Sequence, residues 1–223
     1  TIFGTNELIF GDPYYWFGHL KEDGCKKLCL VYKRTENKNG ITDYMTAGFI
    51  GGGGQWFIKA VYTDKAVFWA CRWVLNKFGA QDNRIWEVTY MNIDTVDITI
   101  KPDADLDACK RSLLKSIERI EKFAIKTERE IWSNRFKEAI GELDSDEPHI
   151  DYYTDLIIEK NYSIAARQLL ACVQKAWVFG GMGWWNDFIY EDEDDQLLNV
   201  NLSNELYYNI CNSIVFATNS YQP

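Results

Sequence analysis

Histidine is scarce in this chain, which contains only His19 and His149 among its 223 residues. Neither stands in a HExxH pattern, and no histidines or cysteines are spaced as a zinc ligand set. No GxSxG turn is present to expose a serine nucleophile. A lone histidine beside an aromatic cluster, as His19 is, is more often a surface or core-edge residue than a base. These absences predict no catalytic residues of the common hydrolase types.

Basic residues are also few relative to acidic ones. The 24 Lys and Arg residues are outnumbered by 33 Asp and Glu residues, which gives a net charge of −9. Because nucleic-acid binding depends on a basic surface, we expect no nucleic acid as a partner. The imbalance suits a basic protein partner, and it serves solubility equally well.

Long apolar runs and closely spaced cysteine pairs are absent as well. No segment approaches the roughly 20 apolar residues of a membrane-spanning helix, and no signal peptide is visible. We therefore expect a cytoplasmic protein without a membrane partner. No CxxC pair occurs among the cysteines, which are Cys25, Cys29, Cys71, Cys109, Cys172 and Cys211. We expect reduced, structural thiols, and a disulfide from Cys25 or Cys29 to a distant cysteine is the alternative.

The amino-terminal half has the features of an antiparallel sheet. Strand-like runs occupy residues 28–32, 43–50, 55–62, 84–91 and 97–101, and Asn39-Gly40 is a strong turn signal. The run 66–75 suits either a strand or a short helix. The four glycines at 51–54 lack the Lys-Ser/Thr of a phosphate-binding loop and precede a strand-like run. We therefore interpret them as a flexible hairpin loop.

From residue 103 the apolar residues recur every three or four positions, which indicates amphipathic helices. One helix up to Gly141 would be about 55 Å long, whereas a compact domain of this size is about 45 Å across. We therefore expect a break near residues 126–130, or else a projecting helix. A short helix over 152–160, a helix capped by Ser163 and a last helix capped by Ser203 follow. The sequence thus predicts one α+β domain over 1–223, in which an antiparallel sheet from strand-rich residues 1–102 packs against three or four helices from helix-rich residues 103–223.

The stretch 177–188 contains three glycines, three tryptophans and two phenylalanines. We interpret Gly180, Gly181 and Gly183 as a structural turn that ends a helix. The turn presents Asn186 and Asp187, although such residues commonly hydrogen-bond within their own turn. The acidic loop that follows adds further candidate partner-binding residues. The full set is Trp184, Trp185, Asn186, Asp187, Glu191, Asp192, Glu193, Asp194 and Asp195.

Carboxylates as close together as Asp192 and Asp194 could bind a hard cation. The segment lacks the glycine turn and the terminal glutamate of a calcium loop. We therefore expect a solvated acidic loop, with no metal and no cofactor.

The stretch from Val178 to Gly183, continued by Trp185-Asn186-Asp187, resembles a motif of bacterial immunity proteins from polymorphic toxin systems. In that family a small residue follows the glycines, and Trp184 takes its place here. The turn at 11–14 and the closing segment 202–220 are also similar to the family, so the likeness covers the two ends of the chain. The resemblance implies a small cytosolic α+β protein without catalytic activity that binds and blocks a cognate toxin domain.

We therefore expect a non-catalytic protein-binding module. Two alternatives remain open. One is a carbohydrate-active enzyme that uses paired carboxylates together with some of the nine tryptophans as stacking platforms. The other is a structural subunit of an assembly, for which the oligomeric state in solution would be decisive.

Overall fold

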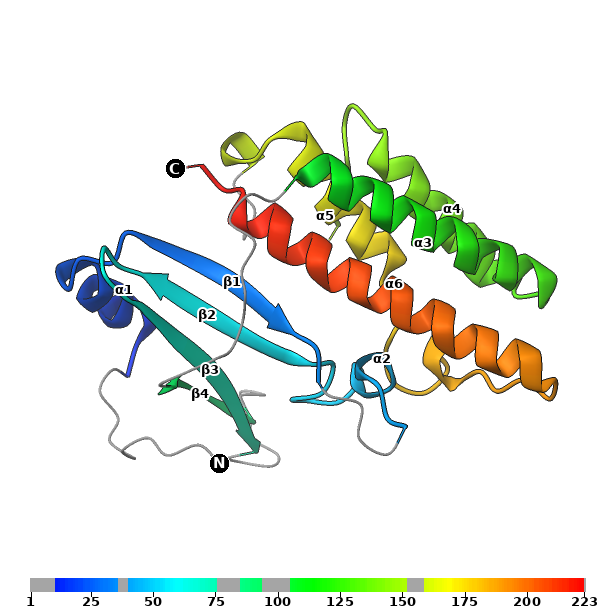
Figure 1. Ribbon diagram of the computed structural model, residues 1–223, viewed down its shortest axis with the longest axis horizontal. Coiled ribbons are helices and arrows are strands. Elements are labelled where there is room, and N and C mark those ends of the chain that lie inside the picture. Colours follow the sequence, from blue (N-terminus) through cyan, green and yellow to red (C-terminus); the bar gives the residue numbers. More distant parts are fainter. Residues whose placement is uncertain (1–10, 36–39, 76–84, 94–104, 152–158, 223) are drawn as a thin grey trace. The chain divides into compact units, whose positions relative to one another are not determined.

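The computed structural model describes residues 11–35, 40–75, 85–93, 105–151 and 159–222 (Figure 1). Contacts group the chain into two compact units. The sheet unit consists of Thr1–Lys33 and Gln55–Ile100, and the helical unit consists of Arg34–Gly54 and Lys101–Pro223. The predicted boundary between the strand-rich and helix-rich halves lies close to the end of the sheet unit. The segment between Arg34 and Gly54 is the exception, because it belongs with the helices.

In the sheet unit, the described residues form a four-stranded antiparallel sheet of order β1-β2-β3-β4. Leu30 lies opposite Ile58, and Trp69 lies opposite Asn92. The strands are β1 (Lys27–Lys33), β2 (Gln55–Val61), β3 (Ala66–Leu75) and β4 (Trp86–Ile93). The run 66–75 is therefore a strand and not a short helix.

Helix α1 (Pro13–Glu22) precedes the sheet. Proline suits the first helical position because its fixed φ is helical and its missing N–H would have no partner there. The backbone N–H of Tyr14 donates to Asp12 Oδ1 at 2.7 Å, so Asp12 caps the helix. The Gly11-Asp12-Pro13 turn is thus the beginning of a helix. Trp16 of α1 packs against Trp69 of β3, with ring centroids 5.3 Å apart.

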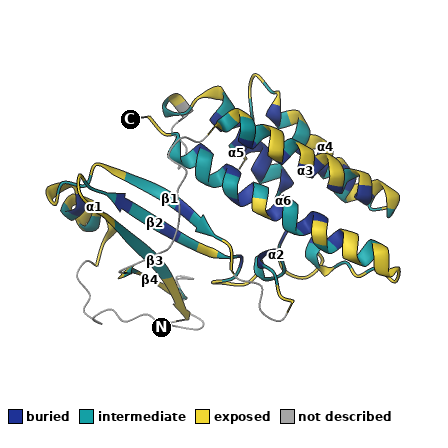
Figure 2. Cartoon of the chain, in the orientation of Figure 1, coloured by how far each residue is buried: buried dark blue, intermediate teal, exposed yellow. Residues whose placement is uncertain are grey.

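In the helical unit, amphipathic helices bury their apolar faces against one another. Figure 2 shows the buried residues along the facing sides of these helices, and Leu113, Ile117 and Ile120 of α3 are among them. The elements are α2 (Asp43–Thr46), α3 (Leu106–Lys126), α4 (Glu130–Leu143), η2 (Glu159–Asn161), α5 (Ile164–Ala176), η3 (Trp185–Asp187) and α6 (Glu193–Asn219). With a sheet from the amino half and helices from the carboxyl half, the described residues confirm the predicted α+β class.

The helical pattern after residue 103 breaks between α3 and α4, as its length predicted. Glu128 N donates to Ile125 O at 3.1 Å, and Arg129 N donates to Ala124 O at 2.8 Å. This pair of bonds is a Schellman motif, which usually places glycine in the left-handed position. Here Glu128 occupies that position, with φ of +58°. Because no glycine marks the turn, the sequence predicted the break from length alone.

The structure corrects two interpretations between residues 43 and 54. The predicted strand over 43–50 is instead α2 followed by turns. The four-glycine run is a turn held in place by specific contacts, and not a flexible hairpin loop. Gly53 (φ +79°) accepts a hydrogen bond from the Tyr207 hydroxyl at 2.7 Å and donates its N–H to Thr46 Oγ1 at 2.9 Å. A methyl group at Gly52 would lie 2.9 Å from the Thr46 carbonyl carbon.

The structure also corrects the predicted acidic loop over 191–195. Helix α6 begins at Glu193, with Asp192 as its N-cap, and Asp192 Oδ1 accepts from Asp195 N at 2.8 Å. Carboxylates in a first helical turn are favoured by the helix dipole. Ser203, predicted as the cap, lies inside the helix and is buried.

Some predicted features lie outside the described residues, namely the strand over 97–101, Asn39 of the hairpin turn and most of the helix over 152–160. All six cysteines are free thiols, and Cys109, Cys172 and Cys211 are buried. Among the described helices, none combines the length and the apolar character needed to cross a bilayer.

Candidate protein-contact surface

Trp185 is the centre of the turn that follows α5. Its side chain is fully buried, and its indole Nε1 donates to Ser203 Oγ of α6 at 2.9 Å. Its backbone N–H donates to Val178 O at 3.1 Å. The ring also packs edge-on against four aromatic rings, those of Phe123, Trp132, Phe136 and Phe188. Trp185 therefore belongs to the core and has no surface to offer a partner in this fold.

Asn186 and Asp187 bind the backbone of their own turn. Asn186 Oδ1 accepts from Gly180 N at 3.0 Å, and Asn186 Nδ2 donates to Gly180 O at 3.1 Å. Asp187 Oδ2 accepts from Gly183 N at 2.6 Å. The structure thus favours the own-turn interpretation for both residues. Asn186 is half-buried, whereas Asp187 remains exposed.

Two of the three turn glycines have a steric reason to be glycine. A methyl group at Gly180 would lie 2.7 Å from the Trp184 ring. Gly183 has φ of +85°, a conformation that L side chains rarely adopt. Gly181 has open space around its Cα. Across from the turn, a methyl group at Gly48 would lie 2.9 Å from Gly181 N, so the 48–54 loop and this turn meet backbone to backbone.

Trp184 is half-buried and points to α4, unlike its neighbour Trp185. Its ring centroid lies 6.2 Å from that of Trp132, and the guanidinium carbon of Arg135 lies 5.7 Å from its centroid. A cation over an aromatic face is attracted by the ring quadrupole. Trp184 therefore supports the turn and offers a partner only part of its surface.

The acidic residues after the turn differ in how available they are. Glu191, Asp192, Glu193 and Asp194 are exposed. Asp195 forms an ion pair with Lys126 of α3, and only 19% of its side chain is exposed. The hydrogen bond to Asp195 raises the pKa of Lys126. Asp195 therefore ties α6 to α3 and is less available to a partner than its neighbours are.

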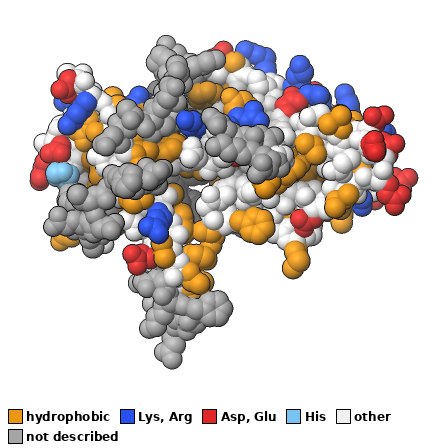
Figure 3. Space-filling view, turned by 60° about the horizontal axis from the view of Figure 1, so that its bottom comes forward, with side chains coloured by type: hydrophobic (Ala, Val, Ile, Leu, Met, Phe, Trp, Pro, Cys, Tyr) orange, Lys and Arg blue, Asp and Glu red, His pale blue; other side chains and the backbone are white. Residues whose placement is uncertain are grey.

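Large apolar side chains are exposed among these carboxylates. Met182 is 98% exposed, Ile189 is 83% exposed and Leu197 is 61% exposed. Figure 3 shows acidic side chains gathered at one end of the helical unit, with hydrophobic side chains next to them. We call this surface the acidic end and define it as Met182, Asp187, Ile189, Glu191, Asp192, Glu193, Asp194 and Leu197.

The corner between α3 and α4 adjoins the acidic end, and sequence reasoning did not assign it a role. The guanidinium carbon of Arg129 lies 4.2 Å from the Phe188 ring centroid and 5.9 Å from that of Tyr190. In the sequence, residues 125–131 are a run of polar and mixed-charge residues between two isoleucines. Such a run also fits a solvated helix face, so it did not indicate this proximity.

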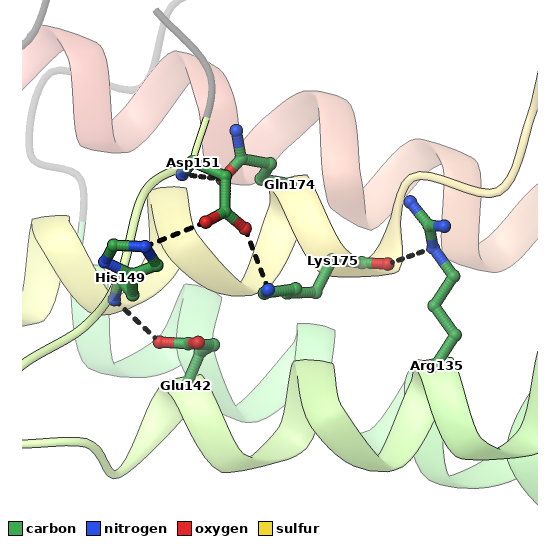
Figure 4. A network of polar contacts seen from close by, with 6 residues as sticks. All are labelled: Arg135, Glu142, His149, Asp151, Gln174 and Lys175. Atoms are coloured by element: carbon green, nitrogen blue, oxygen red, sulfur yellow. Dashed lines mark hydrogen bonds and ion pairs between the residues drawn. The ribbon is translucent and has the colours of Figure 1, made fainter. Parts of the chain in front are cut away.

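A second polar cluster fastens the loop after α4 onto α5 (Figure 4). Asp151 Oδ2 accepts from Lys175 Nζ at 2.8 Å, and Asp151 Oδ1 lies 2.8 Å from His149 Nε2. Glu142 and Gln174 accept hydrogen bonds from the backbone N–H groups of His149 and Asp151, at 3.0 and 2.7 Å. The Lys175 hydrogen bond lowers the pKa of Asp151. The contacts of this cluster hold the loop after α4 against α5, so we assign the cluster a structural role.

The remaining findings concern metals and relatives. Among the described residues, no three His, Cys, Asp or Glu side chains gather in a way that could hold a metal ion. Comparison of the chain with protein-family models found no match, and comparisons with curated proteins and with solved structures found none either. The resemblance to immunity proteins therefore depends on the motifs in the sequence.

Proposed function

We propose that this protein is a non-catalytic protein-binding module that neutralises a cognate bacterial toxin domain, with the acidic end as its contact surface. The observation that carries the proposal is the combination of exposed apolar side chains and exposed carboxylates on one segment that internal contacts hold in place. The motif around Gly180 to Asp187, which resembles immunity proteins, supports the same assignment.

The segment is held in place by contacts within the free protein. Trp185 anchors it in the core, and the side chains of Asn186 and Asp187 bond its glycine turn. Tyr190 N donates to Gln196 Oε1 at 2.9 Å, which fixes the approach to α6. A surface that is ordered in the free protein loses less conformational entropy on binding. Bracing of this kind therefore favours tight association.

The apolar anchors supply the driving force. Protein interfaces have an apolar centre and a polar rim, and Met182, Ile189 and Leu197 are the most exposed apolar side chains of the acidic end. Covering each of them contributes on the order of 1.5–3 kcal/mol before the costs of association. The carboxylates around them would form the rim.

The charge determines which kind of partner fits. Between residues 186 and 196 there are six Asp and Glu residues and no Lys or Arg. A surface of this sign speeds the association of a basic partner and repels an acidic one. Toxin domains that act on nucleic acids need basic surfaces for their own substrates. A basic toxin domain, such as a nuclease, is therefore the partner we propose.

The test begins with the genes beside this one and takes as partner a toxin-like domain encoded there. We expect the two purified proteins to form a stable complex, and we expect expression of this protein to protect cells from that domain. The association rate should fall at least about tenfold from low to high salt. Reversing Glu191, Glu193 and Asp194 to Lys should slow association further.

For a single reversal, Glu191→Lys, the matched control is Glu147→Lys, because Glu147 is also exposed but lies in the loop after α4. Helix α4 places that loop about 20 Å from the α3–α4 corner, at 1.5 Å per residue. Absence of both the complex and the growth protection would refute the proposed function.

A further inference from the structure

We propose that the α3–α4 corner, residues 125–131, is the second half of the toxin-contact surface, and that Glu128 is held in a strained conformation to serve it. This inference rests on the function proposed above. The occupant is the same basic toxin domain, and the corner adds both apolar and charged contacts to those of the acidic end.

The corner and the acidic end are joined by side-chain contacts. Lys126 at the end of α3 pairs with Asp195 in the first turn of α6. Arg129 stacks on Phe188 and Tyr190, which lead into the same helix. Figure 1 accordingly shows the corner and the start of α6 at the same end of the helical unit. A partner seated on one of these surfaces therefore reaches the other.

The corner presents two exposed carboxylates next to the acidic end, those of Glu128 and Glu130. By count, Lys126 and Arg129 balance them. Lys126 is paired with Asp195, and Arg129 keeps its charge but lies over two aromatic rings. Glu128 and Glu130 are therefore the charged groups of the corner that complement a basic partner.

The corner also carries apolar side chains that folding leaves uncovered. Ile131 is 79% exposed in the first turn of α4, and Ile125 is exposed in the last turn of α3. Single exposed apolar residues are common. These two, however, lie at the end that already carries Ile189 and Leu197, and clusters of exposed apolar residues mark interaction sites.

Glu128 supplies an independent reason to assign function here. Its φ of +58° lies in the left-handed region, where a Cβ carries a steric cost that glycine avoids. Strained residues of this kind gather at functional sites. The Schellman motif requires this conformation, and the use of glutamate there in place of glycine is explained if the exposed carboxylate meets a cation of the partner.

The experiment measures affinity for the neighbouring toxin domain and thermal stability, in parallel. Two variants remove the carboxylate without adding strain, Glu128→Gly and Glu128→Asn, because glycine and asparagine both tolerate the left-handed region. We expect each variant to weaken binding at least about fivefold, while Glu128→Gly melts at a higher temperature than the wild type. Ile131→Ser should weaken binding by at least the same factor.

The matched apolar control is Ile164→Ser. Ile164 is also exposed and also lies in the first turn of a helix. It sits close to the chain end, since the neighbouring Asn161 donates to Gln222 O at 2.6 Å and Tyr162 packs against Tyr221. We expect this variant to bind like the wild type.

The outcomes separate this inference from the proposed function. If the wild type binds the toxin domain and the Glu128 and Ile131 variants bind equally well, the inference is overturned and the proposed function stands. If the wild type does not bind, both are overturned. A Glu128→Gly protein that melts at a lower temperature than the wild type would remove the argument from strain.

Discussion

Replacement of Trp185 by alanine tests the central claim about the turn, which is that its second tryptophan belongs to the core. The side chain is fully buried and contacts rings from α3 and α4. Its Nε1 also holds α6 through Ser203.

The magnitude follows from these contacts. Truncation of a buried Trp to Ala costs about 3–5 kcal/mol. Ser203 Oγ also loses a donor, but it still lies 3.4 Å from Asn199 Oδ1, so this adds only about 1 kcal/mol. The sum is about 4–6 kcal/mol, against a total stability of about 5–15 kcal/mol for a typical domain. Trp185→Phe keeps one ring and loses the hydrogen bond, so we expect about 1–2 kcal/mol.

Urea unfolding followed by far-ultraviolet circular dichroism checks both values. The helical unit dominates this signal because it contains most of the helix. We expect a large fall in the unfolding midpoint for Trp185→Ala and a small one for Trp185→Phe, with similar dependence on denaturant in both. A Trp185→Ala protein that loses less than about 1.5 kcal/mol but no longer binds its partner would refute the core assignment and place the residue in the interface.

Further predictions concern a close backbone approach and the cluster after α4. A methyl group at Gly48 would lie 2.9 Å from Gly181 N, so Gly48→Ala should cost about 1–3 kcal/mol. Gly141→Ala should stabilise by about 0.5–1 kcal/mol, because this glycine lies inside α4 with open space around it. Urea unfolding measures both changes, and equal free energies of unfolding for the two variants would contradict both predictions. Lys175→Met should raise the pKa of Asp151 towards its ordinary 3.8, and an unchanged carboxyl titration by NMR would contradict this. Because a lowered carboxyl pKa stabilises above the unfolded pKa and is lost as pH falls through the folded pKa, the variant should lose less stability than the wild type on acidification.

Much of the fold was predictable because it depends on local patterns. The strands over 55–61 and 86–93, the cap at Ser163 and the break near Glu128 all follow from periodicity, turn chemistry or length. The amino end of α6 was also within reach, because carboxylates suit a first helical turn as well as they suit a loop. The first residue of the helix was ambiguous because any of several neighbouring acidic residues could have been the N-cap.

The form of residues 43–54 could not be predicted because it depends on distant partners. The Gly53 carbonyl bonds the hydroxyl of Tyr207, 154 residues later in the chain. Burial raises the pKa of Tyr207, as expected for a phenol enclosed by packing. Nothing in a run of glycines indicates such a partner, and in its absence a flexible loop is the natural interpretation.

The candidate surface was predicted in part. Composition located the acidic residues, but it could not tell which polar side chains turn inward. Asn186 and Asp187 look like contact residues until their bonds to Gly180 and Gly183 are seen. Trp184 and Trp185 are adjacent and chemically identical, yet the 3-10 turn η3 buries only Trp185 fully. Which of the two tryptophans is buried depends on the backbone conformation of the turn, and a single sequence does not determine it.

The chain leaves the sheet unit after β1, contributes residues 34–54 to the helical unit, and returns to the sheet unit at β2. This path affects how the protein can be divided into fragments and in what order it can fold. Tyr44 packs its ring 5.7 Å from that of Phe179, and Gly53 receives the Tyr207 hydroxyl. On the ribosome these early residues must wait until the last helix has been made, which is a slow, long-range closure. A fragment that begins after residue 100 would lack the partners that residues 34–54 supply to Phe179 and Tyr207. We therefore expect the carboxyl half to be less stable alone than in the full chain, although it contains most of the helices.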